Sequence, residues 1–177
     1  ANESLIEDGR SQSDIRQGVT LEVLGEGDSM GPLNDAMKAE ALRLQGDIRY
    51  DIEWTTLDEY LRYLERRGVS PNVASFIGAA TPRTYVIGHE DRPPTPEELD
   101  AMRGLVRQAM EEGALGVASA LIYPPGSFAA TDELVALACR RTTYEWVLRR
   151  VVTDGDAPLA RLVHGQGVVG LCAGEPV

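Results

Sequence analysis

The sequence predicts an α/β fold made of about three consecutive βα units, and three observations indicate it. Short runs rich in β-branched and aliphatic residues alternate along the chain with longer amphipathic stretches. Two of these stretches begin with a capping box, in which a Thr N-cap is followed three residues later by Glu. A glycine follows each of the two stretches, as is typical of a helix C-terminus. Strands that alternate with helices of this length form parallel βαβ units.

The first unit is expected at residues 19–46. Residues 1–18 are polar and contain only a weak helical stretch, and residues 19–24 (VTLEVL) form a strand pattern. The glycine-rich run 25–29 ends this strand. Asp35 is expected to cap the helix that follows, and Gly46 is expected to end it.

The second and third helices have the clearest boundaries. Thr56 and Glu59 form the first capping box, and Gly68 ends that helix. A strand is expected at residues 72–77, and the second capping box follows at Thr95 and Glu98. Pro96 occupies the first turn of this third helix, which Gly113 ends. The third strand is expected at residues 115–120, and Trp54 is expected to be a packing residue.

The segment after the third strand is a candidate binding site. Residues 123–126 read Tyr-Pro-Pro-Gly, a rigid loop, and Thr131 then opens a further helix. In parallel α/β proteins the chemistry usually lies just beyond the C-terminal ends of the strands. Tyr123 therefore suits a substrate contact, and the alternative is an amphipathic side chain that packs beneath the loop.

Composition excludes several classes of partner. The net charge is −11, from 28 acidic and 17 basic residues, which argues against binding to nucleic acid or to an anionic membrane surface. No apolar run approaches the roughly 18 residues that span a bilayer, and no leader pattern is present, so the expected location is cytoplasmic. Cys139 and Cys172 are expected to be reduced.

Four ordered segments resemble one enzyme family. Residues 15–25 (IRQGVTLEVLG) are similar to its IRQGVTTEVxGN segment, and residues 51–61 match its W-x-T-x-x-E-Y-L segment. Residues 72–83 (NVASFIGAATPR) look like NVAxxVGHxxLR, and residues 111–138 contain a counterpart of GALGLSTGLxYxPG…AxTEEL. The chain thereby resembles the N-acyl-D-amino-acid deacylase (D-aminoacylase) branch of the metal-dependent amidohydrolase superfamily, from about residue 15 to residue 138.

The resemblance implies a partial (β/α)8 barrel of the TIM type, because a complete barrel takes roughly 250 residues. It implies hydrolysis of linear amide bonds in N-acyl-D-amino acids by a metal-bound water, with zinc as the metal. The expected partner is thus a small N-acyl amino acid. The chain begins at Ala1 without an initiator Met, which fits a partial chain that is inactive by itself.

The resemblance places few site residues inside the chain. His89 and His164 are the only histidines and neither falls on a family ligand position, so no catalytic residue is expected here. The family often carries a zinc-binding cysteine after its GVT strand. Here that cysteine is absent, and Glu26 is the candidate metal ligand, with Asp28 next and a solvated turn as the alternative for both.

Three residues are expected to bind substrate. Tyr123 matches a family tyrosine that contacts the acyl-amino-acid substrate, and Ser119 matches the first position of the family's S-T-G. Arg83 is expected in a loop after the second strand. There it either binds a substrate carboxylate through two parallel hydrogen bonds or is a solvated surface arginine.

The C-terminal segment differs from the rest. Residues 140–177 carry four acidic and five basic side chains, whereas residues 1–139 carry the other 24 acidic and 12 basic ones. The family pattern also fails after residue 139. We therefore divide the chain into a barrel-like part at 1–139 and an atypical tail at 140–177. The tail is the product of a frame change near residues 139–141, a disordered segment, or a genuine divergent segment.

Two other functions stay open. The chain could be a non-catalytic α/β remnant that self-associates through the open edges of its sheet. It could also belong to a cyclic-amide hydrolase branch of the same superfamily, whose members usually carry a modified lysine that bridges two metals. Lys38, the only lysine, is not expected at a strand end. Ser29 and Ser119 lack the G-x-S-x-G context of a serine hydrolase.

Overall fold

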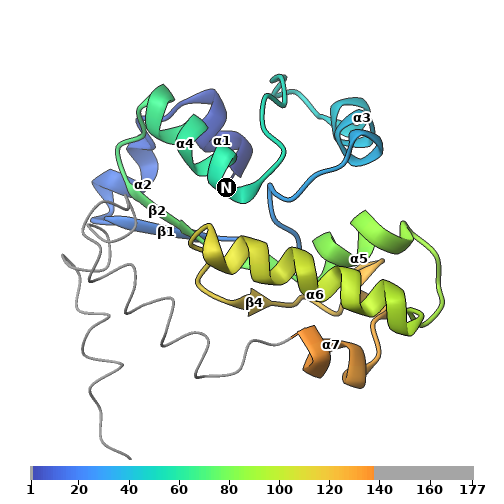
Figure 1. The fold of residues 1–177 in the computed structure, drawn as a ribbon. Helices are drawn as coiled ribbons and strands as arrows, with labels where there is room; N and C mark the ends of the chain where they lie inside the picture. Colours follow the sequence, from blue (N-terminus) through green and yellow to red (C-terminus); the bar gives the residue numbers. More distant parts are fainter. Residues whose placement is uncertain (1, 138–177) are drawn as a thin grey trace, which may run out of the picture. The chain divides into compact units, whose positions relative to one another are not determined.

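The computed structural model describes residues 2–137, and the expected tail at 140–177 lies outside these residues. The described chain alternates strands and helices, as predicted (Figure 1). The strands are β1 (Leu21–Leu24), β2 (Asn72–Ser75), β3 (Ile77–Gly78) and β4 (Val117–Ala118). The helices are α1 (Asn2–Glu7), α2 (Gln12–Arg16), α3 (Asp35–Leu44), α4 (Leu57–Arg67), α5 (Ala80–Ile87), α6 (Pro96–Glu111) and α7 (Thr131–Leu137), with a 3-10 helix at Gly126–Phe128.

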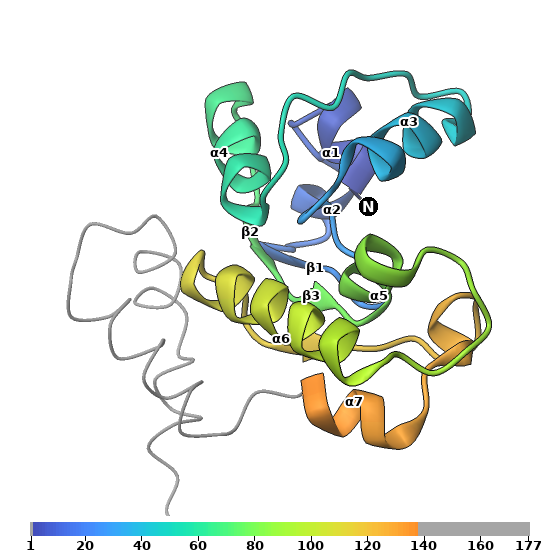
Figure 2. The ribbon, with the colours of Figure 1, turned by 45° about the vertical axis from the view of Figure 1, so that its right-hand side comes forward.

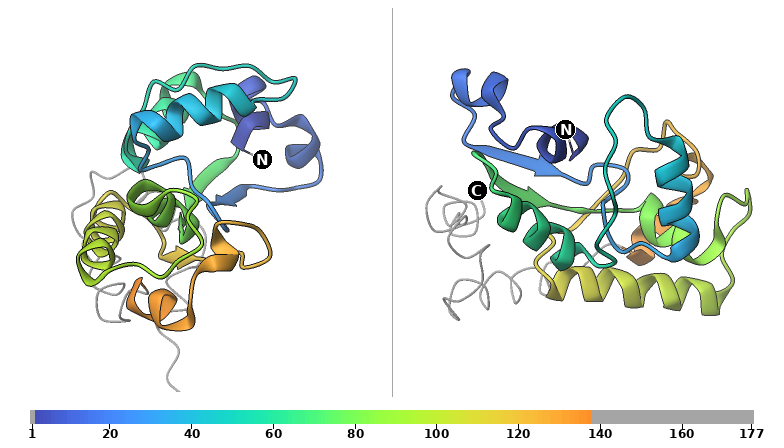
Figure 3. Two further views of the ribbon diagram at one scale, coloured as in Figure 1. Left: turned by 90° about the vertical axis from the view of Figure 1, so that its right-hand side faces the viewer. Right: turned by 90° about the horizontal axis from the view of Figure 1, so that it is seen from above.

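The strands pair in parallel, in the order in which they follow along the chain. β1 lies beside β2, with Leu21 opposite Asn72 (Figure 3), and β3 pairs with β4, with Ile77 opposite Val117. The expected strand at 72–77 is divided at Phe76, whose N–H donates to the Leu24 carbonyl oxygen at 2.8 Å. Residues 72–78 therefore bridge the first and third strands. All three predicted strands are present, and the first and third have fewer paired residues than expected.

The two predicted capping boxes are confirmed. The Thr56 and Thr95 hydroxyls each accept a hydrogen bond from the backbone N–H three residues on, and the Glu59 and Glu98 carboxylates accept one from the N–H of the cap residue. The prediction for α3 was one residue off. The N-cap is Asn34 and not Asp35, because the Asn34 side chain accepts from the Met37 N–H at 2.9 Å.

Helix α5 was not predicted. The sequence GAATPR was interpreted as a loop after a strand, but residues 80–87 form a helix. Pro82 lies in the first turn of this helix, where a proline is tolerated because the N–H that it lacks has no intrahelical acceptor. Helix α6 contacts both α5 and α7 and lies between them (Figure 2).

The core is built from the apolar faces of α4 and α6. The buried side chains of these two helices are Leu57, Tyr60, Leu64, Met102, Val106, Ala109 and Met110. Trp54 is 1% exposed, which confirms it as a packing residue, and its indole N–H donates to the Met30 carbonyl at 2.6 Å. Each large apolar side chain that is fully buried contributes about 1.5–3 kcal/mol.

Glu112 joins the end of one helix to the start of another. It directly follows α6, and its Oε2 accepts hydrogen bonds from the N–H groups of Leu57 (3.1 Å) and Asp58 (3.2 Å). These two donors lie in the first turn of α4 and have no intrahelical acceptor. A residue from the third βα unit thus caps the helix of the second.

Among residues 2–137, none of the helices has the length and apolar character required to cross a bilayer.

Candidate functional site

A cleft of about 610 Å³ lies at the C-terminal ends of the parallel strands. Its walls come from the end of β1 with the loop after it, the N-terminal half of α5, and the segment that follows β4. Helix α3 closes one side with Met37, Ala41 and Leu44. This is the end of the sheet at which parallel α/β proteins place their binding sites, because loops from several strands converge there.

The loop after β1 passes close to its neighbours. Gly25 has a φ of 83°, and a Cβ there would collide with the Phe76 carbonyl oxygen, so this position requires glycine. A Cβ on Gly27 would lie 2.9 Å from the Ala120 Cβ. Glu26 and Asp28, which flank Gly27, are both exposed and line the cleft.

Hydrogen bonds from the start of helix α5 hold this loop in place. The Ser29 N–H donates to Thr81 Oγ1 at 2.7 Å, and the Ala80 N–H donates to the Gly27 carbonyl at 3.1 Å. Ser29 and Thr81 are 5% and 2% exposed. A buried N–H needs an acceptor, so the Thr81 hydroxyl is part of what fixes the loop.

The segment after β4 carries the strongest sequence candidate. Tyr123 lines the cleft and is 68% exposed, so its phenol is accessible to a ligand. The Ser127 N–H donates to the Tyr123 carbonyl at 2.9 Å, which helps hold the turn. Ser119 is exposed, and it is Ala120, the next residue, that lines the cleft.

Arg83 lies elsewhere than expected. It is in α5 and not in a loop, and it is 0% exposed. Its Nη1 donates to Glu133 Oε2 at 2.7 Å, and its Nη2 donates to the carbonyls of Glu90 (3.0 Å) and Arg92 (2.6 Å). Neither sequence interpretation holds in the described chain: this guanidinium is not at the surface and is not free to bind a substrate carboxylate.

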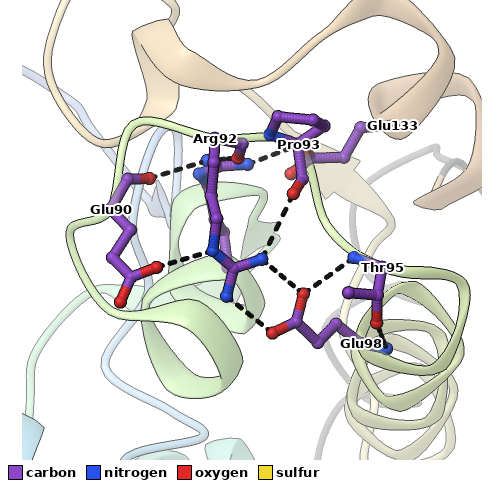
Figure 4. A network of polar contacts seen from close by, with 7 residues as sticks. Glu90, Arg92, Pro93, Thr95, Glu98 and Glu133 are labelled. Atoms are coloured by element: carbon purple, nitrogen blue, oxygen red, sulfur yellow. Dashed lines mark hydrogen bonds and ion pairs between the residues drawn. The ribbon is translucent and has the colours of Figure 1, made fainter.

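A second arginine lies directly beside Arg83. Arg92 makes a two-point contact with Glu98, with both N–O distances 2.7 Å, and its Nε donates to Glu90 (Figure 4). These bonds raise the pKa of Arg92. The hydrogen bonds from Arg92, and then that from the Thr95 N–H, lower the pKa of Glu98 from 4.5 to about 2. The capping box of α6 is thereby extended into the loop before it.

One contact at the cleft rim has no local sequence signal. His89 Nε2 lies 2.9 Å from Glu40 Oε2, joining the loop after α5 to helix α3. His89 is an exposed loop histidine, as predicted. Glu40 lies 49 residues away along the chain, so only the fold brings the two together.

A metal does not fit the described donors alone. Glu26, Asp28, Glu40 and His89 line the cleft, but residues 2–137 contain no group of three or more His, Cys, Asp or Glu residues that could hold a metal ion. Stable sites for zinc usually need three or four protein ligands. The described part can therefore offer single carboxylate ligands, such as Glu26, and not a complete site.

Comparison with known proteins gives a consistent group of relatives. No protein-family model matches the chain. An N-acyl-D-aspartate deacylase from Alcaligenes xylosoxydans xylosoxydans is 34% identical over 122 residues, which is 68% of this chain and 24% of that protein. The chain spans about a quarter of the length of the curated relatives that it matches.

Solved structures agree with this similarity. A D-aminoacylase studied for the role of its binuclear metal center aligns with a TM-score of 0.66 and 28% identity, over 77% of this chain and 29% of that one. An N-acyl-D-glutamate deacylase from Bordetella bronchiseptica, in complex with zinc and a phosphonate inhibitor, aligns with a TM-score of 0.62 and 27% identity. That alignment covers 76% of this chain and 28% of the other.

Proposed function

Because the chain belongs, over the part that it spans, to the D-aminoacylase branch of the amidohydrolases, we propose that its function is metal-dependent hydrolysis of N-acyl-D-amino acids. The observation that carries this proposal is the cleft at the C-terminal ends of the parallel strands, lined by Tyr123 and Glu26. Relatives with this fold act on N-acyl-D-aspartate and N-acyl-D-glutamate, according to their names.

The proposed architecture is part of a (β/α)8 barrel. Its support is the order of the strands: three consecutive strand segments pair in parallel, each with its neighbour along the chain, and helices connect them. This is the arrangement of successive units in a TIM barrel.

Within the proposed site, the described residues bind and orient the substrate and contribute one metal ligand. Tyr123 offers a phenol hydroxyl and an apolar ring to the acyl-amino-acid substrate. Glu26 offers one carboxylate ligand to a divalent metal, which we propose is zinc. No reaction step is assigned to residues 2–137, because they hold no three-donor group.

Substrate binding by the 177-residue chain tests the proposal. Saturation-transfer NMR should detect N-acetyl-D-amino acids and not their L enantiomers. Tyr123→Phe should weaken the signal, whereas Tyr63→Phe, the same change on α4 outside the cleft lining, should not. Equal signals from both enantiomers, or equal effects of the two variants, would contradict the proposed site.

Metal content tests the role of Glu26. In the full-length enzyme, which would supply the remaining ligands, elemental analysis after dialysis against zinc should find less bound metal in Glu26→Gln than in Glu53→Gln, an exposed glutamate outside the cleft lining. Unchanged metal content in Glu26→Gln would remove this residue from the proposed ligand set.

Self-association is a second candidate function, and exposed apolar side chains favour it. Leu121, Ile122 and Val135 are 50%, 76% and 70% exposed, and within residues 2–137 β1 and β4 each pair on one side. Light scattering coupled to size exclusion would detect a concentration-dependent oligomer, and a monomer at every concentration would exclude it.

The cytoplasmic location of the protein stays a prediction.

The cyclic-amidase alternative gains no support from the fold. Lys38 lies in α3, and its Nζ donates to Thr55 Oγ1 at 2.8 Å, whereas a metal-bridging lysine belongs at a strand end.

A further inference from the structure

Helix α5 is only eight residues long, and it contacts more than one of the segments that form the cleft. Its first residues hold the loop after β1 through the Ser29–Thr81 and Gly27–Ala80 hydrogen bonds. A Cβ on Gly126, in the 3-10 turn after Tyr123, would come within 3.9 Å of the Ala80 Cβ. The helix also reaches two further segments through one side chain near its middle, that of Arg83.

The Arg83 guanidinium binds three acceptors from two segments outside α5. Glu133 lies in the first turn of α7, and the carbonyls of Glu90 and Arg92 belong to the loop between α5 and α6. The Arg83 and Glu133 side chains are 0% and 2% exposed, so water does not compete for these bonds. A guanidinium presents its donors in a rigid planar fork, and it therefore fixes the positions of its acceptors as well as neutralising one of them.

One of these segments carries a residue that lines the cleft, and the other follows such a residue along the chain. The loop held by the Glu90 and Arg92 carbonyls includes His89, and α7 comes after Tyr123 and the 3-10 turn that follows it. Arg83 itself does not line the cleft. Its contacts with these segments are therefore buried inside the protein and lie outside the cleft.

We propose that Arg83 is a positioning residue for the cleft, which acts through Glu133 and the Glu90 and Arg92 carbonyls to fix the segments that carry Tyr123 and His89. The expected influence of Arg83 on substrate binding rests on the proposed function, but its effect on the positions of the two segments does not. A buried pair that served stability alone would be replaceable by apolar side chains of similar volume. A positioning residue would not be, because apolar side chains cannot bind the two carbonyls.

Hydrogen exchange of the complete 177-residue chain measures this directly. The reporters are the N–H groups of Ser127, Phe128 and Ala129, which donate to carbonyls within the turn after Tyr123 at 2.9–3.2 Å. In Arg83→Met they should exchange at least about tenfold faster, because local opening of the segment becomes easier. The matched control is Arg62→Met, which removes an arginine with the same 2.7 Å N–O distance to a carboxylate but 56% exposed. The control should leave the reporters unchanged.

A second variant separates positioning from loss of the fold. The double variant Arg83→Met/Glu133→Leu leaves no unpaired buried charge, so it should fold with a thermal midpoint nearer to that of the wild type than Arg83→Met. The proposal requires that the reporter amides still exchange faster in this folded double variant. If the double variant regains wild-type protection at Ser127, Phe128 and Ala129, the pair serves stability only and the proposal is overturned.

A spectroscopic probe reports on the cleft itself. With 3-fluorotyrosine at position 123, the ¹⁹F resonance should shift or broaden in Arg83→Met and in the double variant, and Arg83→Lys should restore it only in part. An unchanged resonance in a folded double variant would also overturn the proposal. Failure of the proposed function has a different signature: N-acetyl-D-amino acids would not bind to the wild type, whatever the exchange and fluorine data showed.

Discussion

Replacing Thr81 by valine should loosen the loop after β1 at a cost that the structure lets us work out. The Thr81 hydroxyl accepts the Ser29 N–H at 2.7 Å, and these residues are 2% and 5% exposed. Valine has nearly the same shape but no acceptor, so the Ser29 N–H would be buried without a partner. That loss costs about 1–3 kcal/mol, and the added methyl group returns up to about 0.8 kcal/mol.

The expected net loss in the free energy of unfolding is therefore about 0.2–3 kcal/mol, centred near about 1.5 kcal/mol. For a chain of this size, each kcal/mol lowers the thermal midpoint by about 2–4 °C, so the central value corresponds to a decrease of about 3–6 °C. Urea unfolding followed by circular dichroism gives the free energy, and a thermal scan gives the midpoint.

Thr84→Val is the matched control for this measurement. Thr84 lies in the same helix, and its hydroxyl donates to the Ala80 carbonyl four residues back at 2.8 Å. Such a bond adds little to a helix, and the side chain is only half-buried, so the change should stay within about 0.5 kcal/mol. Equal losses in the two variants would refute the reasoning that a buried acceptor holds the loop.

Two further predictions concern pH and packing. The folded-state pKa of Glu98 is lowered to about 2, chiefly by Arg92, so its contribution to stability is present above about pH 5 and is lost as the pH falls toward 2. Urea midpoints should fall over this range, and less so in Glu98→Gln. Gly78→Ala would place a Cβ 2.5 Å from the Asp28 Cα and should cost about 1–3 kcal/mol in urea unfolding. Gly104 lies in open space on α6, so Gly104→Ala should instead raise the free energy of unfolding by about 0.5–1 kcal/mol. A decrease in the free energy of unfolding for Gly104→Ala would contradict the reasoning that the space around each glycine decides the effect.

The parts of the fold that depend on local interactions were predictable from the sequence. The capping boxes at Thr56 and Thr95 involve residues three apart, so the pattern alone fixes where α4 and α6 begin. The cap of α3 was misplaced because Asn34 and Asp35 are adjacent and both suit an N-cap.

Helix α5 and its role depend on contacts distant in the sequence. Its first turn contains threonine and proline, which do not distinguish a helix start from a loop. The sequence predicts a surface or ligand-binding role for Arg83, because arginine is almost never fully buried unless it is paired. Its partner, Glu133, lies 50 residues further on, and no sequence spacing connects the two.

The candidate cleft was predicted in part. Tyr123 and Glu26 both line it, in agreement with their positions after strand ends. The wall contributed by α3 and the Glu40–His89 contact were not predicted, because the direction in which α3 crosses the strand ends is set by tertiary packing. The roles of Tyr123, Ser119 and Glu26 stay predictions until ligand and metal binding are measured.

The position of Glu112 bears on how the chain unfolds. Its carboxylate lies near the C-terminal end of α6, where a negative charge is unfavourable, and at the N-terminal end of α4, where it is favourable. Fraying of α6 would therefore withdraw the cap from α4 and open the start of α4 at the same time. Two helices from different βα units should thus lose their protection in a single cooperative step rather than one after the other.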